Sequence, residues 1–175
     1  MTAVLGDLLW APTVPPATEA GTGAGTNPLR ETDALQEAQL LDLRWHALSS
    51  TLGLLFELRT AMQFDVGTAA VLMVRGAREC AWDASPAQSP LTAWNVVGSE
   101  PSRAAGSFGM TLSFYPRAGL RLAGESAEFY VVDVPGLGDT PPDYVEAASD
   151  ISNLGQRLPS WASPFSPLWS ASLHG

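Results

Sequence analysis

Hydrophobic and polar residues along the chain follow the period of two that is typical of half-buried β-strands. Short segments with this alternation, or with a continuous apolar run, predict strands over residues 69–75, 77–82, 91–98, 108–115, 119–123 and 127–134. Turn-forming residues separate them, as in Pro116–Gly119, and residues 99–107 have the composition of a loop. Short strands joined by short turns predict a mainly β fold, either an antiparallel sandwich or an open barrel of about seven to eight strands.

Residues 41–59 fit two patterns. The hydrophobic residues of this segment fall near a helical stripe, which would make it a helix. They also alternate with polar residues, which would make it a hairpin whose first strand has Asp42, Arg44 and His46 on one face. The run Ser49–Gly53 contains several weak helix formers. We therefore favour the hairpin, and the helix is the alternative.

Two short helices are expected, one towards each end of the folded part. The first covers residues 31–39, and the second covers residues 149–157 with Ser149 or Asp150 as its N-cap. Prolines exclude a helix in the stretch that follows, over residues 158–169. This stretch predicts an extended strap whose aromatic residues pack back on the sandwich, namely Trp161, Phe165 and Trp169.

Residues 1–30 are expected to form a flexible arm ahead of a single β-rich domain over residues 31–175. Residues 11–28 are rich in Pro, Gly and Thr and hold too little apolar surface to fold. The apolar segment before this linker has two interpretations. It either folds back on its own domain or stays disordered, or it docks on a partner protein through its anchors Leu8, Leu9 and Trp10.

The charge of the chain narrows the class of its partners. The chain has nine arginines, no lysine and 18 acidic residues, so its net charge is −9. This balance argues against nucleic acids and anionic membrane surfaces, because neither would release counterions to such a protein. Seven acids fall within residues 125–150 without a cation among them: Glu125, Glu128, Asp133, Asp139, Asp143, Glu146 and Asp150. They predict a solvated acidic face or a docking surface for a basic partner, and their spacing does not match a calcium-binding EF-hand loop.

Residues 133–136, Asp-Val-Pro-Gly, resemble the switch segment of P-loop GTPases, where a strand ends in Asp-x-x-Gly. That family also needs a Gly-rich loop ending in Gly-Lys-Ser/Thr, which a chain without lysine cannot supply. We therefore expect no nucleotide. The segment is expected to end a strand in a Pro-Gly turn.

Few residues are suited to catalysis or to metal binding. Cys80 is the only cysteine, which excludes an internal disulfide and a cysteine-based zinc site, and its strand pattern is typical of a buried, inert thiol. His46 and His174 are the only histidines. The one candidate acid–base group combines Asp42, His46 and Glu57 on the polar face of the hairpin. We predict no metal and no cofactor.

The composition, with arginine in place of lysine and abundant Ala, Gly and Pro, predicts a bacterial protein. The first ten residues carry Asp7 and no basic residue, which argues against a signal peptide, and no apolar run is long enough to span a bilayer, so a cytoplasmic location is expected. Taken together, these features predict a non-catalytic protein-binding module, such as an immunity, accessory or adaptor protein. The alternatives are a β-barrel that binds a small ligand in its interior and a hydrolase that uses Asp42, His46 and Glu57.

Overall fold

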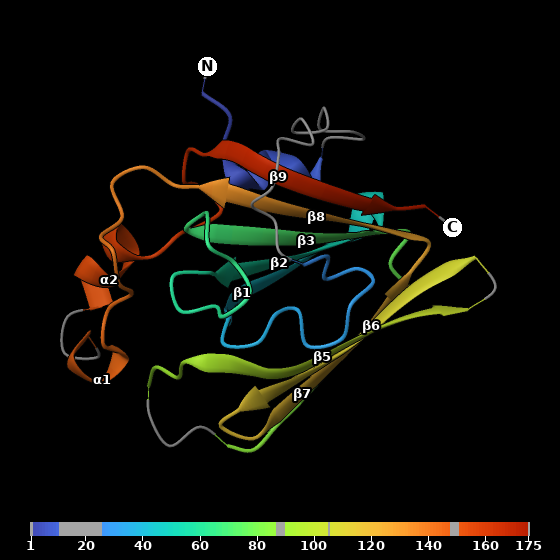
Figure 1. Ribbon diagram of the computed structural model, residues 1–175, viewed down its shortest axis with the longest axis horizontal. Helices are drawn as coiled ribbons and strands as arrows, with labels where there is room; N and C mark the ends of the chain where they lie inside the picture. Colours follow the sequence, from blue (N-terminus) through green and yellow to red (C-terminus); the bar gives the residue numbers. More distant parts are fainter. Residues whose placement is uncertain (1, 11–25, 87–89, 105, 148–150, 175) are drawn as a thin grey trace.

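The structure, a computed structural model, describes residues 2–10, 26–86, 90–104, 106–147 and 151–174. Nine antiparallel strands in these residues form one open sheet in the order β4-β7-β6-β5-β1-β2-β3-β8-β9 (Figure 1). The strands are β1 Gln39–His46, β2 Thr51–Glu57, β3 Ala69–Arg75, β4 Glu79–Ala84, β5 Trp94–Ala104, β6 Ser107–Tyr115, β7 Ala118–Gly124, β8 Ser126–Asp133 and β9 Ser166–Leu173. The helical elements are short: η1 Leu5–Leu9, η2 Ala47–Ser49, α1 Tyr144–Ala147 and α2 Ile151–Arg157.

The mainly β prediction is confirmed, and so is the hairpin over residues 41–59, which is formed by β1 and β2. The expected strands between residues 69 and 134 are also present with small changes at their ends. The C-terminal helix forms as α2, although its expected N-caps at residues 149 and 150 lie outside the described residues.

Three segments differ from the prediction, beginning with residues 31–39. They form turns instead of a helix, because Asp33 and Glu37 have positive φ angles of 59° and 64°. Their backbone N–H groups instead bond the carbonyls of Ser99 and Val96 in β5, at 2.7 and 2.9 Å. A helix would have used these N–H groups internally.

The other two differences are strands where a loop and a strap were expected. β5 continues to Ala104 and pairs with β6 from Asn95 to this end, apart from a bulge at Val97, although it contains Pro101. β9 includes Pro167 and lies at the edge of the sheet beside β8. Proline lacks a backbone donor, so a strand tolerates it where the N–H side has no strand partner.

The sheet folds into two halves with the main core between them. Figure 1 shows β1, β2, β3, β8 and β9 in one layer and β5, β6 and β7 crossing below them. Leu54, Phe56 and Leu72 come from the first half, and Val96 and Phe108 come from the second. All five side chains are buried in this inner core, which contains most of the buried apolar residues.

A second, smaller cluster covers the other face of β2, β3 and β8. η1 lies across this outer face with Leu5, Leu8 and Leu9 buried. Two backbone bonds fix the segment to the C-terminal strap, from the Leu5 N–H to the Ser163 carbonyl at 3.0 Å and from the Gly6 N–H to the Trp161 carbonyl at 2.7 Å. The apolar N-terminal segment therefore packs against its own domain.

The two halves of the sheet meet at a very short junction. β1 and β5 pair through two residue pairs, Gln39 with Asn95 and Leu40 with Trp94. The register of β1 shifts at Leu41, immediately beyond Leu40, whereas the register of β5 shifts at Val97, on the opposite side of the two pairs. A bulge bends a strand and ends its pairing. Because β1 bends at Leu41 and β5 begins only at Trp94, the two strands separate beyond the pair Leu40–Trp94.

No helix within the described residues has the length and apolar character that crossing a membrane requires.

Candidate functional site

The separation of β1 from β5 leaves a groove with three adjoining hollows around Trp94. The outer hollow, of about 520 Å³, lies between β1, residues 90–94 and the α2 region. The inner hollow, of about 310 Å³, lies between β1 and β4. A side hollow of about 540 Å³ lies between residues 91–95, Tyr115–Arg117 and α1. Leu40, Leu41 and Asp42 of β1 line both the outer and the inner hollow.

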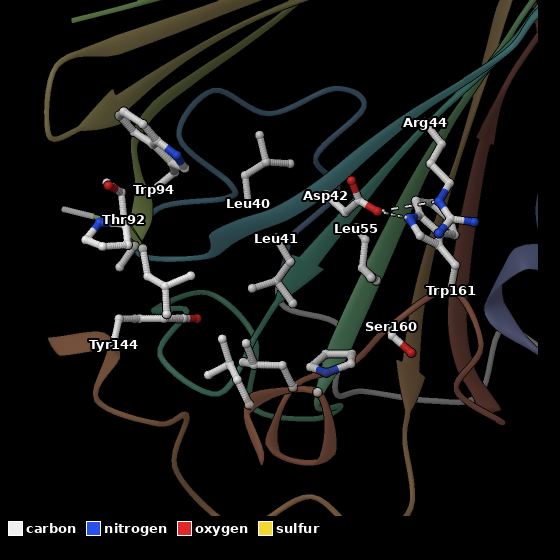
Figure 2. Close-up of a pocket in the computed structure, with 17 residues that line it drawn as sticks. Leu40, Leu41, Asp42, Arg44, Leu55, Thr92, Trp94, Tyr144, Ser160 and Trp161 are labelled. Carbon is white, nitrogen blue, oxygen red and sulfur yellow. Dashed lines mark hydrogen bonds and ion pairs between the residues drawn. The ribbon is translucent and has the colours of Figure 1, made fainter. Parts of the chain in front are cut away.

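The outer hollow has aromatic and apolar walls and one neutralised charge. Figure 2 shows Thr92, Trp94 and Tyr144 on one side, Asp42, Arg44 and Trp161 on the other, and Leu40 and Leu41 between them. One carboxylate oxygen of Asp42 accepts hydrogen bonds from Trp161 Nε1 at 2.8 Å and from Arg44 Nε at 3.4 Å. The Arg44 guanidinium also lies 5.4 Å from the centre of the Trp161 ring. This network neutralises Asp42 and leaves the hollow largely apolar.

The inner hollow has no charged side chain apart from Asp42 at its border. Leu43, Cys80, Trp82 and Trp94 complete its walls. The Trp82 and Trp94 rings meet edge to face at 5.3 Å, and Trp82 remains 42% exposed. Burial raises the pKa of the Cys80 thiol, so at neutral pH this group is a protonated, weakly nucleophilic part of an apolar wall.

Between the two hollows runs the strand edge of β1. Among the described residues, Asp42–His46 pair with β2 on one side, and residues 41–46 have no strand partner on the other. Backbone N–H and C=O groups of a strand point alternately to its two edges. The Leu43 N–H bonds the Asp42 carboxylate at 2.8 Å. The edge therefore presents main-chain donors and acceptors at the centre of the groove, one of which is bonded to the strand's own side chain.

A buried ion pair fixes the wall that α2 contributes. Glu57 and Arg59 are 0% and 5% exposed and lie 2.6 Å apart. The Arg59 guanidinium also donates to the carbonyls of Gly138, Thr140 and Arg157 at 2.7, 3.0 and 2.9 Å. Arg59 thus ties the end of α2 and the loop after β8 to the sheet.

Tyr144 in α1 closes this wall. Its hydroxyl donates to the Gln39 side-chain oxygen at 2.9 Å. Burial, reinforced by the negative charge of Glu57, raises the pKa of Tyr144 to about 12. The hydroxyl therefore keeps its proton, and its hydrogen bond to β1, throughout the physiological pH range.

The candidate acid–base group does not come together. Asp42, His46 and Glu57 share the outer face of the hairpin, as their alternation predicts, but four residues of strand separate Asp42 from His46, or about 13 Å. Glu57 pairs with Gln39, at the opposite end of the hairpin from His46. His46 contacts the Ser49 hydroxyl at 2.7 Å, and Glu57 is held by Arg59. These distances exceed the hydrogen-bond reach that general acid–base catalysis needs.

The acids of residues 125–150 do not form one unpaired face. Glu128 is buried on the outer face of the sheet, where it pairs with Arg75 at 3.0 Å and accepts a hydrogen bond from Tyr130 at 2.9 Å. Glu125 contacts Arg78 at 3.5 Å, and it lies about 25 Å along β8 from Asp133. Five of the acids are exposed, namely Glu125, Asp133, Asp139, Asp143 and Glu146, and Asp150 lies outside the described residues. Alternation within β8 explains why Glu128 is buried, because it turns this side chain to the face that η1 covers.

The three proposed N-terminal anchors are not equally accessible. Leu8 and Leu9 are 1% and 6% exposed beneath η1, whereas Trp10 is 63% exposed and packs against the His46 ring at 3.8 Å. Most of the linker that was expected to carry this segment, residues 11–25, lies outside the described residues. Leu29, inside the expected arm, is buried in the inner core.

The Asp133–Gly136 segment has the predicted turn geometry. β8 ends at Asp133, and Gly136 has a φ of +86° that favours glycine. Within the described part of the chain, no three His, Cys, Asp or Glu side chains gather as a metal site would require.

Sequence reasoning missed the residues of the groove. Trp82 and Trp94 have the alternation of core residues, and their strands do contribute to the core, so nothing local marks them as a site. The available signal was the concentration of tryptophan in short strands. Comparisons of the chain with protein-family models, with curated proteins and with solved structures give no match.

Proposed function

We propose that this protein is a non-catalytic protein-binding module, of the accessory, adaptor or immunity kind, and that it binds its partner in the groove beside β1. One observation carries this proposal: the outer and inner hollows flank a strand edge without a partner among the described residues, and Trp82, Trp94 and Trp161 line them. Tryptophan is enriched among the residues that dominate binding energy at protein interfaces.

The shape of the groove favours a protein segment over a compact ligand. The hollows adjoin one another along β1 and open to the surface. The interior between the two halves of the sheet, where a barrel would hold a small ligand, is filled by buried side chains such as Phe56, Leu72 and Phe108. A protein-binding role is therefore preferred to the small-ligand alternative.

The polar groups around the groove favour binding over catalysis. Asp42 is neutralised by Arg44 and Trp161, and Glu57 by Arg59. Burial keeps the Cys80 thiol protonated. Catalysis needs a group that is free to exchange a proton or attack a substrate, and these groups have structural partners or surroundings that oppose both.

A selection with random peptides tests the proposal. The purified protein is offered a phage-displayed library of random twelve-residue peptides, and enriched peptides are synthesised and measured by calorimetry. We expect binding that Trp82→Ala weakens by about tenfold or more, as for a tryptophan at the centre of an interface. The matched control is Leu48→Ala, which removes a side chain that is 91% exposed in the β1–β2 loop.

Two results would overturn the proposal. One is a selection without enrichment over an unrelated protein. The other is a set of peptides that bind the wild type and the Trp82→Ala variant equally. Circular dichroism of both variants confirms that they are folded, so that lost binding is assigned to the groove.

A further inference from the structure

We infer that the partner contributes an extended segment that adds to the edge of β1 as a further strand, with its side chains alternating between the outer and inner hollows and basic residues beside its apolar stretch. This inference rests on the proposed function and specifies the kind of partner that the groove accepts. Such strand addition obtains affinity from main-chain hydrogen bonds and specificity from pockets for alternate side chains.

The first support is the difference between the two strand edges at the junction. Residues 33–38 cover the edge of β5 that turns away from β6, with backbone bonds to Val96 and Ser99. The edge of β1 has no covering segment of this kind among the described residues beyond Leu40. The Asp42 carboxylate bonds one group of this edge, the Leu43 N–H, and an added strand would displace it. An exposed edge of this kind is a template for another strand unless charge, proline or a covering segment protects it.

The second support is the placement of the two hollows on opposite faces of β1. Leu43 faces the inner core, and it lines the inner hollow. Arg44 lies over Trp161 of the outer cluster, Leu55 belongs to the same cluster, and both line the outer hollow. Successive side chains of a strand point to opposite faces of a sheet. A strand laid along this edge would therefore direct one side chain into the inner hollow and the next into the outer hollow.

The chemistry of the hollows specifies the side chains that fit. The inner hollow, walled by leucine, cysteine and tryptophan, suits an aliphatic residue or methionine. The outer hollow offers Leu41, Leu55 and Trp161, and its single charge is already paired, so it also suits a large apolar residue. Because both hollows are apolar, the added segment has consecutive apolar residues, in contrast to the alternation of a strand that is half exposed.

Charge specifies the flanks of the segment. β4 borders the inner hollow with Cys80 and Trp82, and its acids Glu79 and Asp83 lie on the opposite face of the strand. The acid beside the groove is Asp143, which lines the side hollow, is exposed and has no ion-pair partner among the described residues. The chain as a whole has a net charge of −9. A segment with lysine or arginine beside its apolar stretch is therefore the complementary partner.

The test uses the tightest peptide from the random library and a series of its variants, each N-methylated at one residue. Strand addition predicts alternation: methylation at every second residue removes a hydrogen bond to β1 and lowers affinity by about tenfold or more, and methylation between them has little effect. Amide hydrogen exchange of the protein should slow within residues 41–46 when the peptide binds.

Other results separate this inference from the proposed function. If binding depends on Trp82 but methylation has the same effect at every peptide position, and exchange within residues 41–46 is unchanged, strand addition is wrong and the proposed function stands. If peptide binding does not depend on Trp82 at all, the proposed function is wrong.

A charge-exchange pair tests the flanks. Replacing the basic residues of the peptide with glutamate should weaken its binding, and Asp143→Lys in the protein should restore part of the loss. Equal affinity of both peptides for the wild type would overturn the inference of a basic partner. Asp133→Lys, at an exposed acid at the end of β8, is the matched control.

Discussion

At the rim of this groove, individual charged side chains fix the position of the surrounding backbone. Arg59 uses every guanidinium nitrogen, with Nε and one terminal nitrogen on Glu57 and the remaining hydrogen bonds on three main-chain carbonyls. A buried arginine needs partners for all of its donors. The pair therefore sets where α2 lies relative to β1.

Replacing Arg59 should lower the free energy of unfolding much more than replacing an exposed arginine. We expect Arg59→Met to lower the free energy of unfolding by about 3–5 kcal/mol, because it leaves the Glu57 carboxylate buried without its partner. Arg44→Met, at an ion pair about half exposed, should cost less than about 1 kcal/mol. Urea unfolding of the two variants measures both values, and equal losses would contradict the structural role of Arg59.

Cys80 allows a chemical measurement of the inner hollow. Its raised pKa leaves less thiolate at a given pH than a free cysteine has, so it should react more slowly with iodoacetamide than the same residue in denatured protein. The rate should begin to rise only at a higher pH, and a peptide bound in the groove should slow it further. Reaction as fast as in the denatured protein would show that the thiol is not shielded.

The sequence indicates which face these residues occupy, but not their partners. The period of two places Glu57 on the outer face together with Asp42, as found. The carbonyls that complete the Arg59 site belong to residues about 80 to 100 positions away. Local alternation contains no information about contacts at that distance, and for this reason Glu57 was predicted in a surface group when it is buried.

Among the elements, the N-terminal segment depends most on a single glycine. A Cβ atom at Gly53 would lie 2.7 Å from Leu9 and 2.9 Å from the Trp161 ring. The absence of a side chain there lets η1 and the C-terminal strap lie directly on β2. Arg75 adds hydrogen bonds to the last carbonyls of η1, at Leu8 and Leu9.

Adding a methyl group at this position should loosen the segment. We expect Gly53→Ala to destabilise the protein by about 1–3 kcal/mol, as overpacking does, and to speed hydrogen exchange at the Leu5 and Gly6 amides, which bond the strap. Gly138→Ala is the matched control, because nothing lies within 4 Å of a Cβ built there. Unchanged exchange in Gly53→Ala would mean that the contact is relieved without moving η1.

Elements with local partners were predictable, and those with distant partners were not. β1 with β2 and β6 with β7 are hairpins, and their alternation and turns lie within one stretch of sequence. Residues 31–39 have helical composition, but their bonds run to β5 more than 55 residues away. Turn composition over residues 99–107 was equally misleading, because pairing with β6 overrides it.

At the scale of the whole molecule, the groove is a product of how the two halves of the sheet are joined. The sequence predicts strands and therefore an antiparallel fold, but the order β5-β1-β2 depends on pairing between residues about 55 positions apart. The groove opens where this pairing ends. A site of this kind has no linear motif, so its residues could be identified only after the strand order was known.

The bulge at Leu41 also has a consequence for evolution. It is one extra residue, equivalent to a single inserted codon. Without it, the alternation of Leu40 and Asp42 would remain correct and β1 would have no reason to turn away from β5. A relative without this residue should have β1 and β5 paired beyond Leu40, and presence of the codon would mark the members able to accept a strand from another protein.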